Sequence, residues 1–254
     1  MAEEEVLAGG NMTAVTRVGN TVRRTAGPWT PAVHALLAHL RRRGFTRAPE
    51  PLGRDERGRE VLGFLSGAVA TYPLAASVLS DHTLREVAGL LREYHDATVD
   101  FEPPAGAVWQ WPPHEPREVL CHNDFCPYNL LFEDGRITGV IDFDTASPGP
   151  RVWDLGYTAY RFVPLTGPRN PDVGHPGVAE QRRRLALFCD AYGLPEITPA
   201  DVLRIAITRL QDLVEFIVGS ARAEDPAQQA VLDRGDTEIY RHDIDHLTAT
   251  AILD

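Results

Sequence analysis

The chain has 254 residues, a hydrophobic fraction of 43% and a formal net charge of −11. This length suits one large domain or two small lobes, and the apolar content is enough for a buried core, which excludes a disordered chain. The acidic balance disfavours a nucleic-acid-binding protein, because such proteins carry positive surfaces. No apolar run approaches the roughly 18 residues needed to span a bilayer.

The N-terminus reads Met-Ala-Glu-Glu-Glu and lacks the basic start of a secretory signal, so we expect a cytoplasmic protein. The cysteines, Cys121, Cys126 and Cys189, match no zinc-binding spacing. A clip between the first two is conceivable, but reduced thiols are the expectation for a cytoplasmic protein. The chain contains no lysine, so every fixed cation is an arginine.

The first 65 residues are rich in predicted strands. A strand near residues 6–8 precedes two β-rich runs, 14–18 and 21–24, and the Gly19-Asn20 pair between these runs predicts a hairpin. Thr30 is a plausible N-cap for a helix with Pro31 in its first turn, and Gly44 is expected to end this helix. Residues 52–54 and 60–65 predict a second hairpin.

From residue 66 the pattern changes, beginning with a linker at Ser66-Gly67. A helix is expected through residue 95, and the prolines between 103 and 116 indicate an ordered loop. Three short apolar strands follow, and most of the remaining chain is predicted to be helical, at about 153–162, 178–192, 199–222 and 236–252. We therefore expect an α+β fold with a β-rich lobe at 1–65, a larger helical lobe at 66–254, and a ligand cleft between them.

The residues suited to chemistry lie between the predicted strands. Asp124 and Asn129 belong to a His-x-Asp-x-x-x-x-Asn motif that begins at His122, and Asp142 follows at the end of a third strand. Phosphoryl transfer needs an aspartate that accepts the proton of the attacking hydroxyl, and an asparagine and a second aspartate that hold magnesium. The alternative is that these polar residues only stabilise turns, as aspartate and asparagine often do.

This segment resembles the catalytic loop of the aminoglycoside phosphotransferase and choline kinase group, distant relatives of protein kinases. The resemblance implies a two-lobed protein-kinase-like fold in which Asp124 is the catalytic base and Asn129 and Asp142 bind Mg²⁺. It also implies that His122 supports the catalytic loop. The Trp-Asp-Leu run at 153–155 resembles a later segment of the group, whose aspartate, here Asp154, braces that loop.

The same resemblance assigns the phosphate-binding elements of the N-terminal lobe. The group has a phosphate-covering loop, matched here by Gly9, Gly10 and Asn11, where glycine lets backbone N–H groups approach anionic oxygens. Its strand cation, usually lysine, aligns with Arg23, or with Arg24 if the register slips by one. Arginine can also bind phosphate, through two parallel hydrogen bonds.

Two further nucleotide contacts rest on the same resemblance. The group pairs its strand cation with a helix glutamate, and the alignment places His34 at that position. The segment containing Leu62 and Phe64 aligns with the interlobe hinge, whose backbone would pair with the nucleotide base.

We therefore expect a kinase that moves the γ-phosphoryl group of ATP or GTP to a hydroxyl of an aminoglycoside-like or other polar small molecule. The expected partners are the nucleotide and this acceptor, with no nucleic acid and no membrane. One alternative is a metabolic kinase for an amino alcohol, a sugar or a homoserine-like acceptor. A second is a non-catalytic pseudokinase, which the missing lysine and glutamate favour and the intact Asp124, Asn129 and Asp142 oppose.

Overall fold

The computed structural model describes residues 4–7, 15–173, 175–223 and 225–250. The chain divides into two compact units, one of Met1–Ala70 with Leu90–Arg151 and one of Thr71–Gly89 with Val152–Asp254. The first unit therefore contains both the N-terminal sheet and the His122 motif. These units combine segments that are distant in the sequence, so they do not test a boundary between two lobes at residue 65. That boundary stays a prediction.

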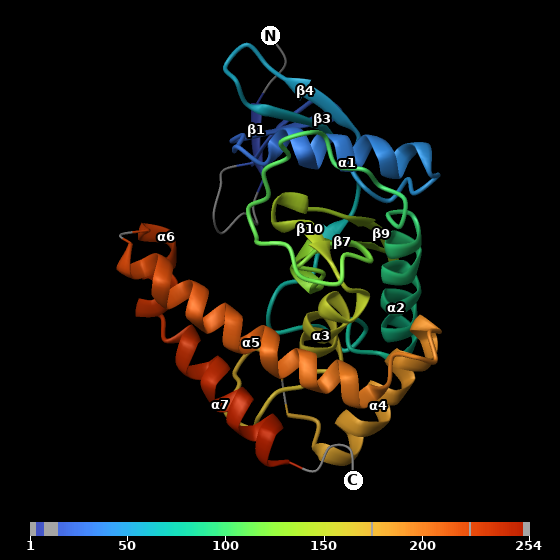
Figure 1. Ribbon diagram of the computed structural model, residues 1–254, viewed down its shortest axis with the longest axis vertical. Coiled ribbons are helices and arrows are strands. Elements are labelled where there is room, and N and C mark those ends of the chain that lie inside the picture. The colour runs from blue at the N-terminus through green and yellow to red at the C-terminus, as the bar shows by residue number, and fades with distance from the viewer. Residues whose placement is uncertain (1–3, 8–14, 174, 224, 251–254) are drawn as a thin grey trace. The chain divides into compact units, whose positions relative to one another are not determined.

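The N-terminal sheet is antiparallel and has the order β1-β2-β3-β5-β4; β1, β3 and β4 are labelled in Figure 1. Both predicted hairpins are confirmed, the first as β2 paired with β3 and the second as β4 paired with β5. In the β3–β5 register, Arg24 is opposite Glu60 and Arg23 is opposite Val61. The bounds of these strands are β1 Glu4–Leu7, β2 Val15–Val18, β3 Thr21–Arg24, β4 Pro51–Arg54 and β5 Glu60–Gly63.

Helix α1 (Thr30–Arg42) packs its apolar face into the core, where Val33 and Leu36 are fully buried. The expected N-cap was wrong by one residue: Trp29 is the cap, and the Thr30 hydroxyl instead accepts a hydrogen bond from the Gly27 N–H at 2.9 Å. The helix ends before Gly44, as predicted, because this glycine adopts a left-handed φ of 84° that other residues rarely reach.

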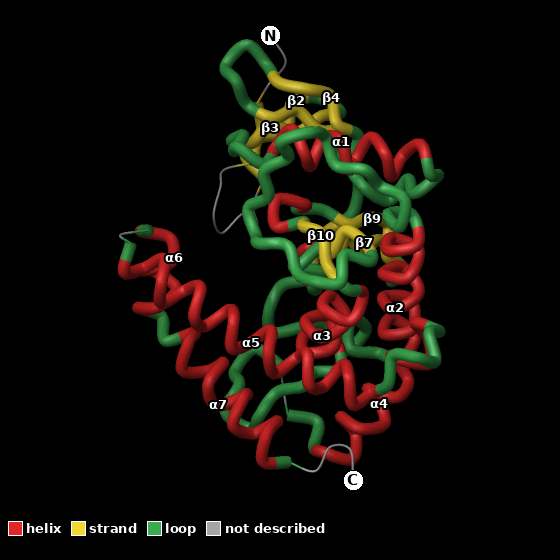
Figure 2. The backbone as a smooth tube through the Cα atoms, in the orientation of Figure 1, coloured by secondary structure: helices red, strands yellow, loops and turns green. Residues whose placement is uncertain are grey.

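Two smaller sheets carry the predicted chemical motif. One has the order β6-β8-β9 and the other pairs β7 with β10, a strand that the sequence analysis missed. The proline-rich segment between 103 and 116 is a loop, as expected (Figure 2), and the His114 N–H ties it to Pro148 O at 2.9 Å. The strand bounds are β6 Ala68–Val69, β7 Val119–Cys121, β8 Leu130–Glu133, β9 Arg136–Val140 and β10 Ser147–Gly149.

The second unit is helical. In it α5 lies against both α6 and α7 (Figure 1). Its N-terminus is fixed by a capping box in which the side chains of Thr198 and Asp201 each bond the other's backbone N–H. Helix α6 was not predicted. The bounds are α2 Asp81–Asp96, which crosses the division at Leu90, α3 Arg151–Phe162, α4 Val178–Tyr192, α5 Pro199–Arg222, α6 Pro226–Asp233 and α7 Asp236–Ala249.

Over the part of the chain that the structure describes, none of the helices combines the length and the apolar character needed to cross a membrane.

Candidate active site

Asp124 follows strand β7, and its carboxylate is held from two sides. The Tyr128 hydroxyl donates to Oδ1 at 3.0 Å, and Asn129 Nδ2 donates to Oδ2 at 2.8 Å. The same amide nitrogen also donates to the backbone oxygen of Asp124 at 3.0 Å. Asp124 is half-buried. The direction of its carboxylate is thus fixed by two neighbouring side chains.

His122 and Asn123 fix the backbone of this loop from within. His122 is fully buried and accepts the Asp124 N–H on Nδ1 at 3.3 Å, while its Nε2 bonds Ile141 O at 3.1 Å. Asn123 has a left-handed φ of 67°, and its Nδ2 donates to Thr145 O at 2.7 Å. Asparagine tolerates this conformation better than most residues. The support predicted for His122 fits these contacts; Asn123 was not predicted.

Asn129 and Asp142 lie at the same end of the β8–β9 hairpin. Leu130 pairs with Val140, and the Ile141 N–H donates to Asn129 O at 2.9 Å. Because Asn129 Nδ2 faces Asp124, the amide oxygen is the atom that could ligate a cation. The Asp142 side chain is 51% exposed. An amide and a carboxylate oxygen suit Mg²⁺, which takes its other ligands from phosphates and water, so the donor set fits the expected metal.

Within the described ranges, no three or more histidine, cysteine or acidic side chains form a group that could hold a metal ion. If Asn129 and Asp142 held a cation, phosphates and water would have to supply its other ligands.

Arg24, rather than Arg23, reaches the candidate site. Its Nη1 donates to Asp142 Oδ1 at 2.9 Å, its Nη2 donates to Asp144 Oδ1 at 2.6 Å, and its Nε donates to Glu60 Oε2. Arg23 instead bonds the Thr21 hydroxyl and lies 3.8 Å from Asp55. Alternate residues of a strand face opposite sides, so only one of the two arginines can reach Asp142, and the sheet register selects Arg24.

The charges in this cluster shift one another's pKa values. Burial lowers the pKa of Arg24, but Asp144, Glu60 and Asp142 together raise it above its ordinary value, so the guanidinium stays charged. Burial raises the pKa of Asp144 to about 6, and the nearby carboxylates of Asp142 and Glu60 add to this, while Arg24 opposes it. The cluster is thus rich in negative charge, which favours a cation.

His34 bonds a carboxylate rather than an arginine. Its Nε2 lies 2.8 Å from Oε1 of Glu60, a residue that is 1% exposed. Burial raises the pKa of Glu60, but the hydrogen bond from His34 and the charge of Arg24 lower it below its ordinary value. Glu60 was not predicted from the sequence; the signal that could have found it is a lone acidic residue at the start of an otherwise apolar strand.

The predicted hinge residues are already engaged in the sheet. Leu62 is buried and paired with both β3 and β4. The Gly63 N–H donates to Glu50 O at 2.8 Å and the Phe64 N–H donates to Asn20 O at 3.0 Å. Backbone pairing of these two N–H groups with a nucleotide base would have to replace those bonds. Nucleotide contact through Leu62 and Phe64 stays a prediction.

Two other predicted elements stay predictions for different reasons. Gly9, Gly10 and Asn11 lie outside the described residues. Asp154 is 1% exposed in the first turn of α3, and its support of the catalytic loop stays a prediction.

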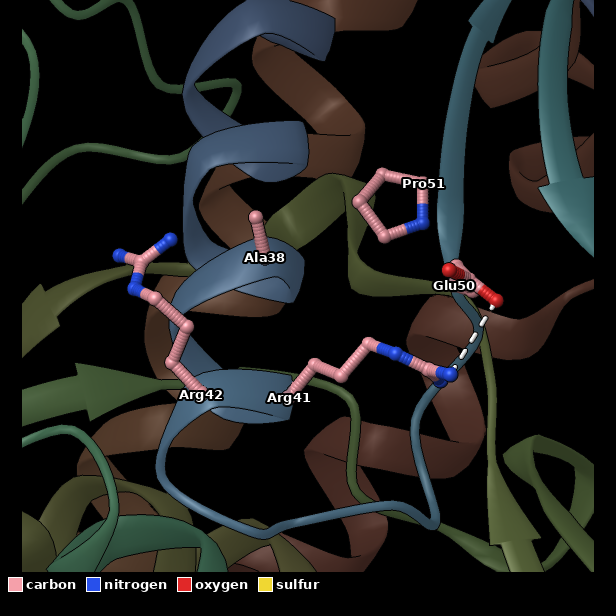
Figure 3. Close-up of a pocket in the computed structure, with 5 residues that line it drawn as sticks. All are labelled: Ala38, Arg41, Arg42, Glu50 and Pro51. Atoms are coloured by element: carbon pink, nitrogen blue, oxygen red, sulfur yellow. Dashed lines mark ion pairs between the residues drawn. The ribbon is translucent and has the colours of Figure 1, made fainter.

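A surface hollow on the first unit is separate from these residues (Figure 3). Arg41 and Glu50 form an ion pair across it, with Arg41 Nη2 3.4 Å from Glu50 Oε2. Its lining consists of Ala38, Arg41, Arg42, Glu50 and Pro51. Because none of these side chains is a candidate for phosphoryl transfer, we do not assign the reaction to this hollow.

Comparison with known sequences points to phosphotransferases. The model of the phosphotransferase enzyme family matches residues 106–188, a range that includes Asp124, Asn129 and Asp142. A trifolitoxin immunity protein of Rhizobium leguminosarum bv. trifolii is 34% identical over 201 residues, covering 76% of each chain. A homoserine kinase of Beijerinckia indica subsp. indica is 26% identical over 246 residues, covering 78% of this chain and 74% of the kinase.

Solved structures share the fold at low sequence identity. The amicoumacin kinase hAmiN superposes with a TM-score of 0.70 at 13% identity, covering 98% of this chain and 90% of that one. A choline/ethanolamine kinase family protein from Mesorhizobium loti gives 0.64 at 16% identity, covering 99% and 90%. The predicted protein-kinase-like α+β fold class is confirmed.

The fold and the family match together define a phosphotransferase. The chain belongs to the phosphotransferase enzyme family.

Proposed function

We propose that this protein transfers the γ-phosphoryl group of ATP or GTP to a hydroxyl of a small polar molecule, with Asp124 as the base. The observation that carries the proposal is the Asp124 carboxylate, held between Tyr128 and Asn129 beside the hairpin end that bears Asp142. A residue that merely stabilised a turn would satisfy its own backbone instead of having both oxygens fixed by neighbouring side chains.

In the proposed reaction the acceptor oxygen attacks the γ-phosphorus, and its proton passes to Asp124. A new O–P bond forms as the bond to the bridging oxygen of the β-phosphate breaks, and the nucleoside diphosphate leaves with that electron pair. Arg24 would steady the phosphates through its terminal nitrogens. Asn129 and Asp142 would hold Mg²⁺, which supplies positive charge against the phosphate oxygens when bound.

The nucleotide and metal assignments are supported by what two structural neighbours bind. The amicoumacin kinase was solved with AMP-PNP and Ca²⁺, and an aminoglycoside 2′-phosphotransferase-IIIa was solved with GDP. Both support a nucleotide in this chain, and the first also supports a divalent cation. The hard oxygen donors of Asn129 and Asp142 are compatible with Mg²⁺, the cation that we propose.

For the acceptor we propose a hydroxyl-bearing toxic compound, which phosphorylation would inactivate. The support is the 34%-identical relative that is named an immunity protein, together with the neighbouring kinase solved with amicoumacin. A homoserine-like acceptor is the second candidate, because a homoserine kinase aligns over 78% of this chain. A single panel of compounds can separate the two candidates.

The test is a transfer assay with purified protein, Mg²⁺, and either ATP or GTP. The panel contains hydroxylated antibiotics, homoserine, choline and ethanolamine, and the phosphorylated acceptor is detected by mass spectrometry. We expect acceptor-dependent product that an Asp124→Asn variant does not form. Tight nucleotide binding with no transfer to any acceptor would instead support a pseudokinase.

A further inference from the structure

Glu60 is a buried carboxylate with a separate partner on each oxygen. Oε2 accepts from Arg24 Nε, and Oε1 is bonded by His34 Nε2 at 2.8 Å. The residue is 1% exposed. Burying a carboxylate is costly unless hydrogen bonds and opposite charge compensate, and here both are present. The position is therefore built to keep an ionised carboxylate beside Arg24.

The contact with Glu60 fixes where Arg24 points. A guanidinium is planar, so holding Nε on one edge sets the direction of both terminal nitrogens. Those nitrogens lie 2.9 Å from Asp142 Oδ1 and 2.6 Å from Asp144 Oδ1. The terminal nitrogens of Arg24 thus point toward Asp142. The proposed function places the metal and the phosphates beside this residue.

We propose that Glu60 is the positioning residue for Arg24, and that His34 holds Glu60 in turn. The carboxylate that orients Arg24 is then Glu60 of strand β5. Helix α1 contributes only His34, which donates a hydrogen bond to Glu60. This inference rests on the proposed function, because that function gives Arg24 its role at the phosphates. It assigns roles to two residues that contact neither reacting atom.

The first experiment removes the charge of Glu60 and keeps its shape. Glu60→Gln should raise the nucleotide dissociation constant by roughly 10-fold to 100-fold, the range expected for a hydrogen bond between charged groups. The nucleotide KM should rise more than kcat falls. The matched control is Glu50→Gln, which removes an exposed carboxylate that pairs with Arg41 at 3.4 Å; both constants should stay at the parent value.

A double variant separates positioning from plain structural support. His34→Glu combined with Glu60→Gln moves the carboxylate from β5 to α1, and we expect it to recover most of the lost nucleotide affinity. If Glu60 only stabilised the sheet, affinity would follow the melting temperature and the double variant would recover none of it.

A second pair of variants leaves Glu60 in place, in case Glu60→Gln does not fold. His34→Leu removes the donor to Glu60 and should weaken nucleotide binding. His34→Gln keeps a hydrogen-bond donor to Glu60, so its nucleotide affinity should equal that of the parent. Equal nucleotide affinity of the two His34 variants, or of Glu60→Gln and the parent, would overturn this inference and leave the proposed function standing. Failure of the parent to bind ATP or GTP with Mg²⁺ would overturn the proposed function and this inference with it.

Discussion

At the scale of single residues, the fixed carboxylate of Asp124 leads to a sharp prediction. Asp124→Asn keeps the shape of the side chain but removes the proton acceptor, so kcat should fall by roughly 10²–10⁴-fold. The melting temperature should change little. The matched control is Asp134→Asn in the exposed β8–β9 turn, which should leave kcat unchanged. A kcat within a few-fold of the parent for Asp124→Asn would remove this residue from the role of base.

The two adjacent arginines of β3 give a second prediction. Arg24→Ala should raise the nucleotide KM by roughly 10–100-fold, because a charge-assisted contact is lost. Arg23→Ala should leave it near the parent value, since Arg23 contacts Thr21 and Asp55 instead. Arg24→Lys should bind the nucleotide more weakly than the parent, because lysine lacks the planar, forked guanidinium group.

Steady-state kinetics with varied nucleotide decide between the two arginines. If Arg23→Ala raised the KM and Arg24→Ala did not, the phosphates would lie on the other face of the sheet from Asp142.

At the scale of elements, α3 and α5 approach closely at Gly156. A Cβ built there would lie 2.8 Å from the Ala206 backbone nitrogen. Gly156→Ala should therefore destabilise the protein by about 1–3 kcal/mol, the usual cost of overpacking. Gly219→Ala on α5 is the matched control: no atom lies within 4 Å of its added Cβ, so alanine should be neutral or stabilise the helix by up to about 1 kcal/mol. Urea unfolding of both variants measures the difference, and equal stabilities would refute the close contact.

At the scale of the whole molecule, metal and nucleotide should stabilise the first unit. A ligand at 100 times its dissociation constant adds about 2.7 kcal/mol to the folded state. We expect ATP with Mg²⁺ to raise the melting temperature and EDTA to remove the metal-dependent part. Asp142→Ala should lose more of this shift than Asn129→Ala, because it deletes a full negative charge beside a dication. Calorimetry with and without EDTA gives the comparison, and an unchanged metal-dependent shift in Asp142→Ala would contradict the metal assignment.

The buried thiols give a second whole-molecule prediction. Cys121, Cys126 and Cys189 are buried and form no disulfide, and burial raises the pKa of Cys189 to about 12, with further contributions from Asp190 and Asp201. Because only the thiolate reacts, iodoacetamide at pH 8 should label the native protein very slowly and label all three thiols in denaturant. Mass spectrometry counts the labels; fast native labelling of Cys189 would show that α4 opens.

The sequence by itself determined what depends on neighbours along the chain. Two β-rich runs on either side of Gly19-Asn20 predicted the first hairpin, and helical periodicity placed α5 at the observed Pro199–Arg222. The spacing of His122, Asp124 and Asn129 indicated the phosphotransferase class, because this pattern lies within a few consecutive residues and can be read without the fold.

Only the tertiary structure decided what depends on residues that are distant in sequence. The pairing of β3 with β5 set Arg24 opposite Glu60 and so turned Arg24, not Arg23, toward Asp142, 118 residues away. The contact of His34 with Glu60 likewise joins a helix to a strand 26 residues on. A slip of one residue reverses every side chain of a strand, and local propensity is nearly the same in either register. The choice was therefore made by burial and charge pairing in the folded molecule.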